Sequence, residues 1–406
     1  MSAVPPVATA PPVATAPPQT HAANGDRVSG PPAAAAPASA NRYLSLDVLR
    51  GLTVALMIVV NTPGDWNTVF APLLHAQWHG FTPTDWVFPT FLFVVGNALS
   101  FALPKYARMG DCAVLAKVGK RSAIIFLLGF LLFWFPFVAV DGAGNWGLIP
   151  LSSTRIPGVL QRIALCFGLA ALILHFWKEK GALAYSVLAL LGYWLVLALR
   201  GDYTLTGNAP AKFDLWLLGE RHLYHGEGLP FDPEGMLGTI PATVNVIAGY
   251  FAGRLILARG ASYETLARLM MAGVACIGVA LCWDQAFPIN KKLWTSSYVL
   301  YTIGLDLLVL PLLIYVIEMR GQRGWTYFFE VFGKNTLFIY LLSELAVVVL
   351  VKTQAGKGSG YDWLYAHTFQ PLAPPKVASL LFAVSFMLAC WAVGYAMDRR
   401  RIYVKV

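Results

Sequence analysis

Long apolar stretches separated by short polar connectors occupy most of the chain after residue 40. A helix needs about 20 apolar residues to cross the hydrocarbon core of a bilayer, and about ten stretches reach or approach that length. They cover residues 44–62, 84–104, 120–140, 157–177, 183–200, 237–257, 268–286, 297–317, 333–351 and 377–397. The pattern predicts an all-α fold, a polytopic membrane helix bundle with about ten transmembrane helices.

The first 40 residues have a different composition. The unit PPVATA occurs at 5–10 and again at 11–16, and Pro and Ala dominate the tract. Such a segment lacks the apolar and aromatic side chains needed to bury a core. We therefore predict a disordered, Pro/Ala-rich cytoplasmic tail over 1–40 and one transmembrane domain over 41–406. The tail is not expected to be a secretory signal, because no basic segment precedes an apolar stretch.

Composition and charge agree with a membrane protein. The chain is 57% hydrophobic and 13% charged, whereas soluble domains carry about 25% charged residues. The net charge is +9, but the basic residues sit in short tracts between apolar runs, which disfavours nucleic acid as a partner. With the N-terminus in the cytoplasm, the inner connectors hold most of the Lys and Arg. The positive-inside rule then places both termini in the cytoplasm.

Charged side chains inside predicted spans need an explanation, because each costs about 2.5–3.5 kcal/mol at a helix centre. Asp47 and Arg50 share one face at the start of the first span. They form either an interfacial ion pair or, through Arg50, a contact with an anionic ligand entering from the cytoplasm. Asp306 and Glu344 lie within later spans, where they either pair with arginines or mark a proton path.

A second group of polar residues lies at the start of the fourth span. Arg155 precedes the span, and Gln161 and Arg162 lie one to two turns inside it. One interpretation is a buried ion pair with Asp306 or Glu344. The other is a phosphate contact, because a guanidinium group recognises phosphate bidentately.

The predicted outer loop 61–83 contains no Lys or Arg but holds His75 and His79. Asp85 opens the next span, where it either caps the helix or holds the His75 imidazole in one tautomer and strengthens it as a base. The spacing of the two histidines is weak evidence for zinc. No metal is predicted, and the five scattered cysteines are expected to be buried apolar side chains.

Several blocks occur in the order and spacing of one family. They are 45–51 (SLDVLRG), 75–89 (HAQWHGFTPTDWVFP), 155–162 (RIPGVLQR), 231–240 (FDPEGMLGTI), 288–298 (PINKKLWTSSY) and 333–340 (GKNTLFIY), with Asn61 and Glu344 as single matches. Over 42–406 the chain resembles the heparan-alpha-glucosaminide N-acetyltransferase family and its bacterial NagX-like relatives.

The resemblance implies a transmembrane acetyltransferase. Such an enzyme moves an acetyl group from cytoplasmic acetyl-CoA to the amine of a glucosamine-type sugar on the periplasmic side. The family's catalytic histidine falls on His75, its partner carboxylate on Asp85 and an active-site asparagine on Asn61. The phosphates of acetyl-CoA at the cytoplasmic mouth are assigned to Arg50 and Arg162, with Gln161 beside them.

Acyl transfer from a thioester to an amine needs a base, and an imidazole with a pKa near 7 suits that task. His75 would act directly or would first become acetylated, and the sequence leaves both routes open. Asn61 is a candidate donor to the oxyanion. His79 stands where eukaryotic members have asparagine, so a periplasmic amino sugar is expected as acceptor rather than heparan sulfate.

Two other functions remain open from the sequence. A secondary transporter of amino sugars or related small solutes would also place ionisable groups within its spans, but the two halves show no convincing repeat. A structural subunit would not need so many ionisable groups there. The expected location is the bacterial inner membrane as a multi-pass protein among membrane lipids, and a homodimer is compatible with the resemblance.

Overall fold

The computed structural model of the chain describes residues 43–140, 145–356 and 358–404. The predicted tail over 1–40 lies outside the described residues. The long helices are α1 (Leu44–Asn61), α2 (Pro83–Ala107), α3 (Asp111–Trp134), α4 (Val159–Phe176), α5 (Lys178–Arg200), α7 (Thr239–Arg259), α8 (Tyr263–Asp284), α9 (Ser296–Leu313), α11 (Thr336–Lys352) and α13 (Pro375–Arg399). Shorter helices are α6 (Ala209–Leu218), α10 (Thr326–Lys334) and α12 (Gly360–Thr368), and a π-helical segment (Ile314–Met319) extends α9.

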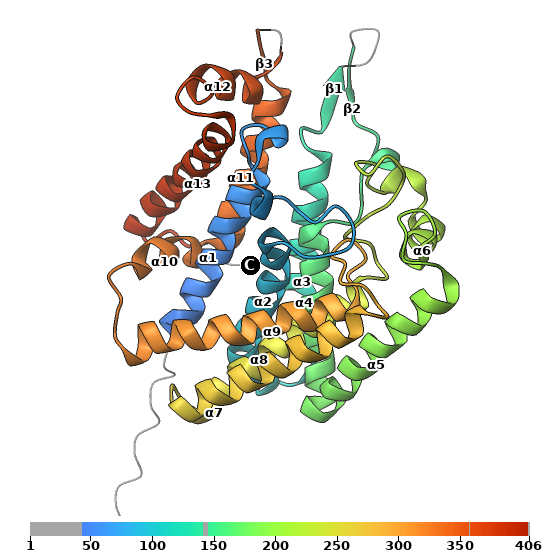
Figure 1. Cartoon of the computed structure of the whole chain (residues 1–406), viewed down its shortest axis with the longest axis vertical. Coiled ribbons are helices and arrows are strands. Elements are labelled where there is room, and N and C mark those ends of the chain that lie inside the picture. Colours follow the sequence, from blue (N-terminus) through green and yellow to red (C-terminus); the bar gives the residue numbers. More distant parts are fainter. Residues whose placement is uncertain (1–42, 141–144, 357, 405–406) are drawn as a thin grey trace, which may run out of the picture. The chain divides into compact units, whose positions relative to one another are not determined.

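Two small antiparallel hairpins complete the described secondary structure. The strands β1 (Val138–Val140) and β2 (Trp146–Leu148) pair with each other, as do β3 (Gln354–Ala355) and β4 (Gly358–Ser359). Both hairpins project from the same end of the helical domain in Figure 1. The same view shows α8 and α9 side by side, farther from that end. The predicted span 120–140 is therefore too long at its end, because the helix stops at Trp134 and the chain continues into β1.

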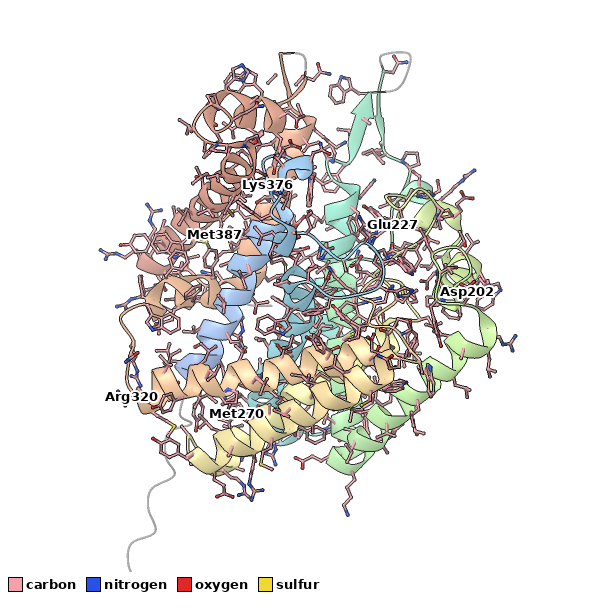
Figure 2. All side chains as sticks on the ribbon, in the orientation of Figure 1. Asp202, Glu227, Met270, Arg320, Lys376 and Met387 are labelled. Atoms are coloured by element: carbon pink, nitrogen blue, oxygen red, sulfur yellow. The ribbon has the colours of Figure 1, made fainter. Side chains whose placement is uncertain are left out.

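The membrane character of the bundle is confirmed. Among the described residues, eight helices are long and apolar enough to cross a membrane, and the bent pair α10–α11 would make a ninth. The long helix α3 is not among them, because it carries Lys117, Lys120 and Arg121 close together. Two labelled basic residues lie towards opposite ends of the bundle in Figure 2. Arg320 follows the π-helical segment that extends α9, and Lys376 lies at the start of α13.

The predicted span 333–351 corresponds to α11 but begins three residues too early. The chain bends by 83° between α10 and α11, at Asn335. The Asn335 side chain donates to the carbonyl oxygen of Ile402 at 3.0 Å and accepts from the amide of Val404 at 2.9 Å. A short amide side chain that bonds to backbone groups competes with a continuous helix. The same contacts tie the segment after α13 to the bend.

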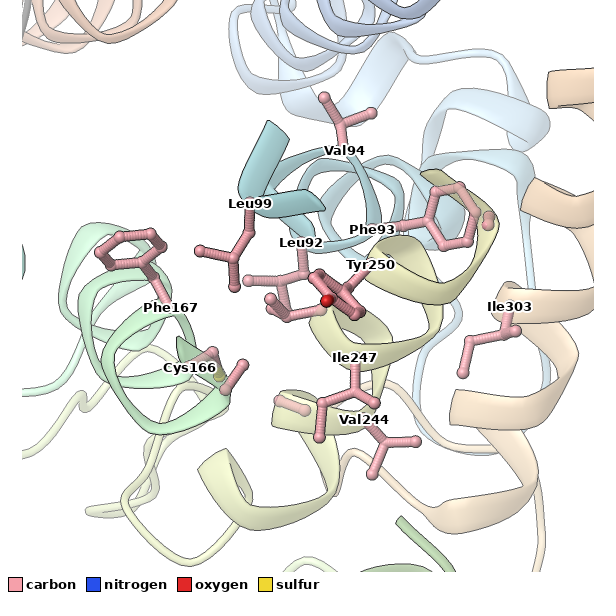
Figure 3. Close-up of a cluster of buried hydrophobic side chains, with 14 of the residues drawn as sticks. Leu92, Phe93, Val94, Leu99, Cys166, Phe167, Val244, Ile247, Tyr250 and Ile303 are labelled. Atoms are coloured by element: carbon pink, nitrogen blue, oxygen red, sulfur yellow. The ribbon is translucent and has the colours of Figure 1, made fainter. Parts of the chain in front are cut away.

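Close packing of small residues brings the central helices together. A Cβ atom on Gly96 of α2 would lie 1.8 Å from the carbonyl oxygen of Val246, and one on Gly249 of α7 would lie 1.9 Å from that of Phe93. Small residues allow such backbone approach in membrane bundles. Figure 3 shows buried side chains of α2, α4, α7 and α9 meeting around this crossing, which fixes the helices that carry the site.

The connectors that follow α1, α5, α6 and α8 meet beside the start of α2. The Gly80 amide donates to the carbonyl oxygen of Ile289 at 2.8 Å. The Trp78 indole donates to the carbonyl oxygen of Tyr203 at 2.7 Å and packs against the ring of Phe231. These contacts bring residues more than a hundred positions apart in the sequence into one cluster.

Candidate functional site

His75 and Asp85 are in direct contact. His75 Nδ1 lies 2.7 Å from Asp85 Oδ1, and the Asp85 side chain is 1% exposed whereas that of His75 is 40% exposed. A carboxylate only accepts, so Nδ1 carries the proton and Nε2 is left with its lone pair. The pair therefore presents a base of fixed tautomer.

Asp85 also caps α2, so both interpretations of this residue hold at once. It is the third residue of the helix after Thr82, with Pro83 at the first position, where proline is favoured. Asp85 Oδ2 accepts from the Thr82 amide at 3.0 Å and from the Ala76 amide at 3.1 Å. The capping box thus orients the carboxylate that holds His75.

Lys291 lies over the His75 ring. Its Nζ is 3.0 Å from both ring nitrogens and 3.9 Å from Asp85 Oδ1. Burial lowers the pKa of the His75 imidazole below its ordinary value, and the Lys291 charge lowers it further while Asp85 opposes both. Burial also lowers the pKa of Lys291. The sequence contains Lys291 within the block 288–298, but periodicity gives no signal that it would meet His75.

Arg155 holds two carboxylates of the loop before α7. Its Nε and Nη2 donate to the two oxygens of Asp232 at 2.8 and 2.7 Å, and Nη2 also donates to Glu234 at 2.7 Å. Burial would raise the pKa of Glu234, but Arg155, with contributions from Arg162 and Lys291, holds it below its ordinary value. The positive charge of Arg155 is thus balanced by Asp232 and Glu234.

The pairing predicted for Arg162 with Asp306 or Glu344 is wrong. Arg162 is buried, donates to the carbonyl oxygen of Gly235 at 2.8 Å and lies over the Trp294 ring. Asp306 instead accepts from the Trp86 indole and the Thr90 hydroxyl on α2. Arg162 therefore lies beside the loop that carries Glu234, and it does not line the cavity described below with Arg50.

Gln161 is also buried, and it packs where Gly129 of α3 and Gly158 leave room. Both polar atoms of its side chain are without a hydrogen-bond partner among the described residues, as are Nε and Nη1 of Arg162. A role for Gln161 and Arg162 in binding acetyl-CoA stays a prediction, and the contacts of Arg162 move it to the His75 end of the molecule.

A cavity of about 380 Å³ lies between α1, α2, α3, α4 and α11. Its charged lining residues are Arg50, Arg121 and Lys334, and Tyr340, Val159 and Val404 line it as well. Most of the remaining wall is apolar, formed by side chains including Met57, Phe91, Val95, Leu99, Ile125, Leu160, Ile163 and Phe167. Arg50 lines this cavity and also contacts Asp47 at 3.5 Å, and its role in binding an anionic ligand stays a prediction.

Tyr340 lies between this cavity and a charged cluster formed by Arg155, Glu234 and Glu344. It lines the cavity, and the charges of Glu344, Glu234 and Arg155 act on its hydroxyl. Asn61, at the end of α1, hydrogen bonds with the Glu344 side chain. The structure therefore pairs Asn61 with Glu344, and its predicted role as an oxyanion donor stays a prediction.

His79 belongs to the same loop cluster, with Nδ1 3.4 Å from Asn290 Nδ2. Among the residues that the structure describes, no group of three or more His, Cys, Asp or Glu side chains has the arrangement of a metal site.

Fold and site together define a multi-pass membrane protein that contains a part-buried histidine–carboxylate contact and a partly basic, largely apolar cavity. The chain belongs to the family described as "Heparan-alpha-glucosaminide N-acetyltransferase, catalytic", whose sequence profile matches residues 42–281. This match confirms the resemblance seen in the sequence.

Two named relatives extend the match. The chain is 30% identical to the heparan-alpha-glucosaminide N-acetyltransferase of Mus musculus, with 76% of this chain and 54% of the mouse protein covered. It is 29% identical to the protein of that name from Homo sapiens, with 75% and 53% covered. The chain thus spans about half the length of the curated relatives it matches.

Proposed function

We propose that this protein is a transmembrane acetyltransferase of the bacterial inner membrane. It takes an acetyl group from acetyl-CoA bound on the cytoplasmic side and transfers it to the amine of a glucosamine-type sugar on the periplasmic side. Both termini lie in the cytoplasm. The observation that carries the proposal is the 2.7 Å contact of His75 with Asp85 in a chain of this family.

The pair suits base catalysis. Asp85 accepts from Nδ1–H, so Nε2 takes the proton of the acceptor amine as its nitrogen bonds to the thioester carbon. The carbon–sulfur bond then breaks, and the thiolate of coenzyme A leaves and recovers a proton from the imidazolium. In the two-step alternative, Nε2 itself bonds to the carbonyl carbon, the carbon–sulfur bond breaks and coenzyme A leaves as the thiolate. The amine then bonds to the carbonyl carbon of the acetyl-imidazole, the bond from that carbon to Nε2 breaks, and the freed Nε2 takes the proton of the amine.

The cavity suits the donor. The phosphates of acetyl-CoA are assigned to the part lined by Arg50, Arg121 and Lys334, since cationic side chains bind phosphate strongly. The apolar wall suits the elongated thioester arm. Tyr340, which also lines the cavity, lies near the charged side chains of Glu344, Glu234 and Arg155. This arrangement brings the acetyl group from one membrane face towards the histidine at the other.

Purified protein, acetyl-CoA and glucosamine should yield free coenzyme A and N-acetylglucosamine. His75→Ala should lose this turnover while keeping its thermal unfolding temperature. His367→Ala is the matched control, because His367 Nδ1 donates to the carbonyl oxygen of Trp363 within its own helix, α12. Uptake of glucosamine into proteoliposomes without consumption of acetyl-CoA would instead identify a transporter.

Sidedness has its own test. In sealed vesicles, turnover should require acetyl-CoA on the face that carries the C-terminus and the sugar on the opposite face. Turnover with both substrates confined to one face would contradict the transmembrane part of the proposal while leaving the acetyltransferase activity intact.

A further inference from the structure

The loop between α8 and α9 holds Lys291 rigidly against His75. Asn290 Oδ1 accepts from the Leu293 amide at 2.8 Å, and the Asn290 amide donates to Thr295 Oγ1 at 3.0 Å. The preceding residue, Ile289, accepts from the Gly80 amide of the histidine loop. The backbone on either side of Lys291 is therefore fixed, and the 3.0 Å contact with Nε2 belongs to the architecture of the site.

The charges around Lys291 leave its ammonium group with no single partner. Asp85, the nearest carboxylate, is 3.9 Å away and is already bonded to His75, Ala76 and Thr82. Glu234 contributes a further negative charge, but Arg155 holds it. The other facing groups, Lys292 and Arg162, are cations.

Lys292 provides a contrast within the same loop. Its Nζ donates to Glu227 at 2.7 Å and lies over the Trp78 ring. An ion pair thus engages Lys292, whereas the Nζ atom of Lys291 lies 3.0 Å from both nitrogens of the His75 ring. The side chain of Lys291 is only 16% exposed, so its charge is weakly screened by solvent.

Resting on the proposed acetyl transfer, we propose that Lys291 is a catalytic residue whose ammonium group donates a hydrogen bond to the carbonyl oxygen of the acyl group. As a nitrogen nucleophile bonds to the carbonyl carbon, the electron pair of the C=O bond moves onto that oxygen, beside the ammonium group. When the carbon–sulfur bond breaks, the pair returns to re-form C=O, and Lys291 keeps its proton throughout.

A preorganised cation beside the developing charge is worth more in a dry site than in water. The same cation has a second effect, because it opposes protonation of the imidazole it touches. The lowered pKa of His75 favours an unprotonated Nε2, as a base requires. One side chain would then serve both the oxyanion and the base.

The test compares Lys291→Met and Lys291→Arg with Lys292→Met in the full-length protein, using acetyl-CoA and glucosamine. Lys291→Met should lower kcat by about 10²–10³-fold, the range for loss of one oxyanion donor, with a small change in KM for acetyl-CoA. Its kcat/KM should also begin to fall at higher pH than in the wild type, because loss of the cation raises the pKa of His75. Lys292→Met should keep both kcat and the pH profile.

A merely structural role would not move the acid limb of the pH profile. Unchanged kcat, or an unchanged acid limb, in Lys291→Met would overturn the proposal, as would acetylation of Lys291 itself, which requires a neutral, nucleophilic amine. If Lys291→Met does not fold, Lys291→Arg keeps the charge and should keep the acid limb in place while lowering kcat. An inactive wild type would refute the proposed function instead.

Discussion

The Tyr298 hydroxyl donates a hydrogen bond of 2.6 Å to the backbone carbonyl oxygen of Asp85. Within α2, that carbonyl would normally accept from the amide four residues later, but this residue is Pro89, which has no N–H. A fully buried tyrosine of α9 thus replaces the missing helix bond. The proline allows the turn bearing Asp85 to be tied to a neighbouring helix.

Tyr298→Phe should therefore lower the free energy of unfolding by about 1–3 kcal/mol, because it leaves a buried carbonyl oxygen without a donor. It should also lower kcat, since the Asp85 turn loses its contact with α9. Tyr185→Phe is the control, because the hydroxyl of Tyr185 donates a longer, exposed bond of 3.2 Å to the carbonyl oxygen of Ile240. Equal effects of the two variants on thermal unfolding would refute this account.

The basic side chains of the cavity give a prediction about donor binding. Arg50→Ala and Lys334→Ala should each raise KM for acetyl-CoA by about tenfold or more, since a hydrogen bond to a charged group is worth about 1.5–3 kcal/mol. KM for the sugar should be unaffected. Lys376→Ala, at the start of α13 and away from this cavity, is the matched control (Figure 2). Steady-state kinetics with each substrate varied would decide, and an unchanged KM for the donor would remove these residues from its site.

The crossing of α2 and α7 gives a prediction about stability. Gly96→Ala should destabilise the protein by about 1–3 kcal/mol or more, because the new methyl group would meet the backbone at Val246, which has no rotamer to yield. Gly192→Ala in α5 is the control, since nothing lies within 4 Å of its added Cβ. Thermal unfolding in one detergent would compare them, and a Gly96→Ala protein as stable as Gly192→Ala would show that the helices are not in close contact.

Asp214 gives a prediction about pH. Burial raises the pKa of this carboxyl to about 7, from an ordinary value near 3.8, although the Met236 amide donates to it. In the folded protein the group stays protonated up to about pH 7, whereas in the unfolded chain it ionises near pH 4. Its contribution to stability is therefore full below about pH 4 and is lost as the pH rises to 7.

Asp214→Asn should consequently be more stable than the wild type near pH 7 and should lose that advantage towards pH 4. The measurement is the difference in unfolding temperature between the two proteins across this range, which cancels the titration of other groups. A difference that grows as the pH falls would contradict the buried, protonated state of Asp214.

The sequence predicted much of the fold because apolar stretches of spanning length leave few alternatives. It also predicted the meeting of His75 and Asp85, since a ten-residue loop that returns to a helix start keeps the two close. Each of the ten predicted stretches overlaps a helix. Where the prediction failed, at Asn335 and after Trp134, the cause is a local contact or a turn that hydropathy does not record.

Contacts between residues that lie far apart in the sequence could not be predicted from spacing along the chain. Arg155 meets Asp232 and Glu234 through packing of separate loops, so no spacing along the chain distinguishes them from Asp306 or Glu344. Lys291 lies 216 positions from His75. It stood within a block that matched the family, yet only the three-dimensional arrangement shows which of two adjacent lysines faces the imidazole.

A single carboxylate oxygen of Asp85 accepts from two backbone amides and so holds together the two ends of a short loop. Because Asp85 Oδ2 accepts from the amides of both Ala76 and Thr82, the residues between them cannot change in number without breaking a bond that also orients Asp85. In the exposed turn that follows Asp65, the amide and the side chain of Asn67 donate to the Asp65 carboxylate within the same turn. Natural or engineered length variation should therefore accumulate in that turn and be absent between positions 76 and 82.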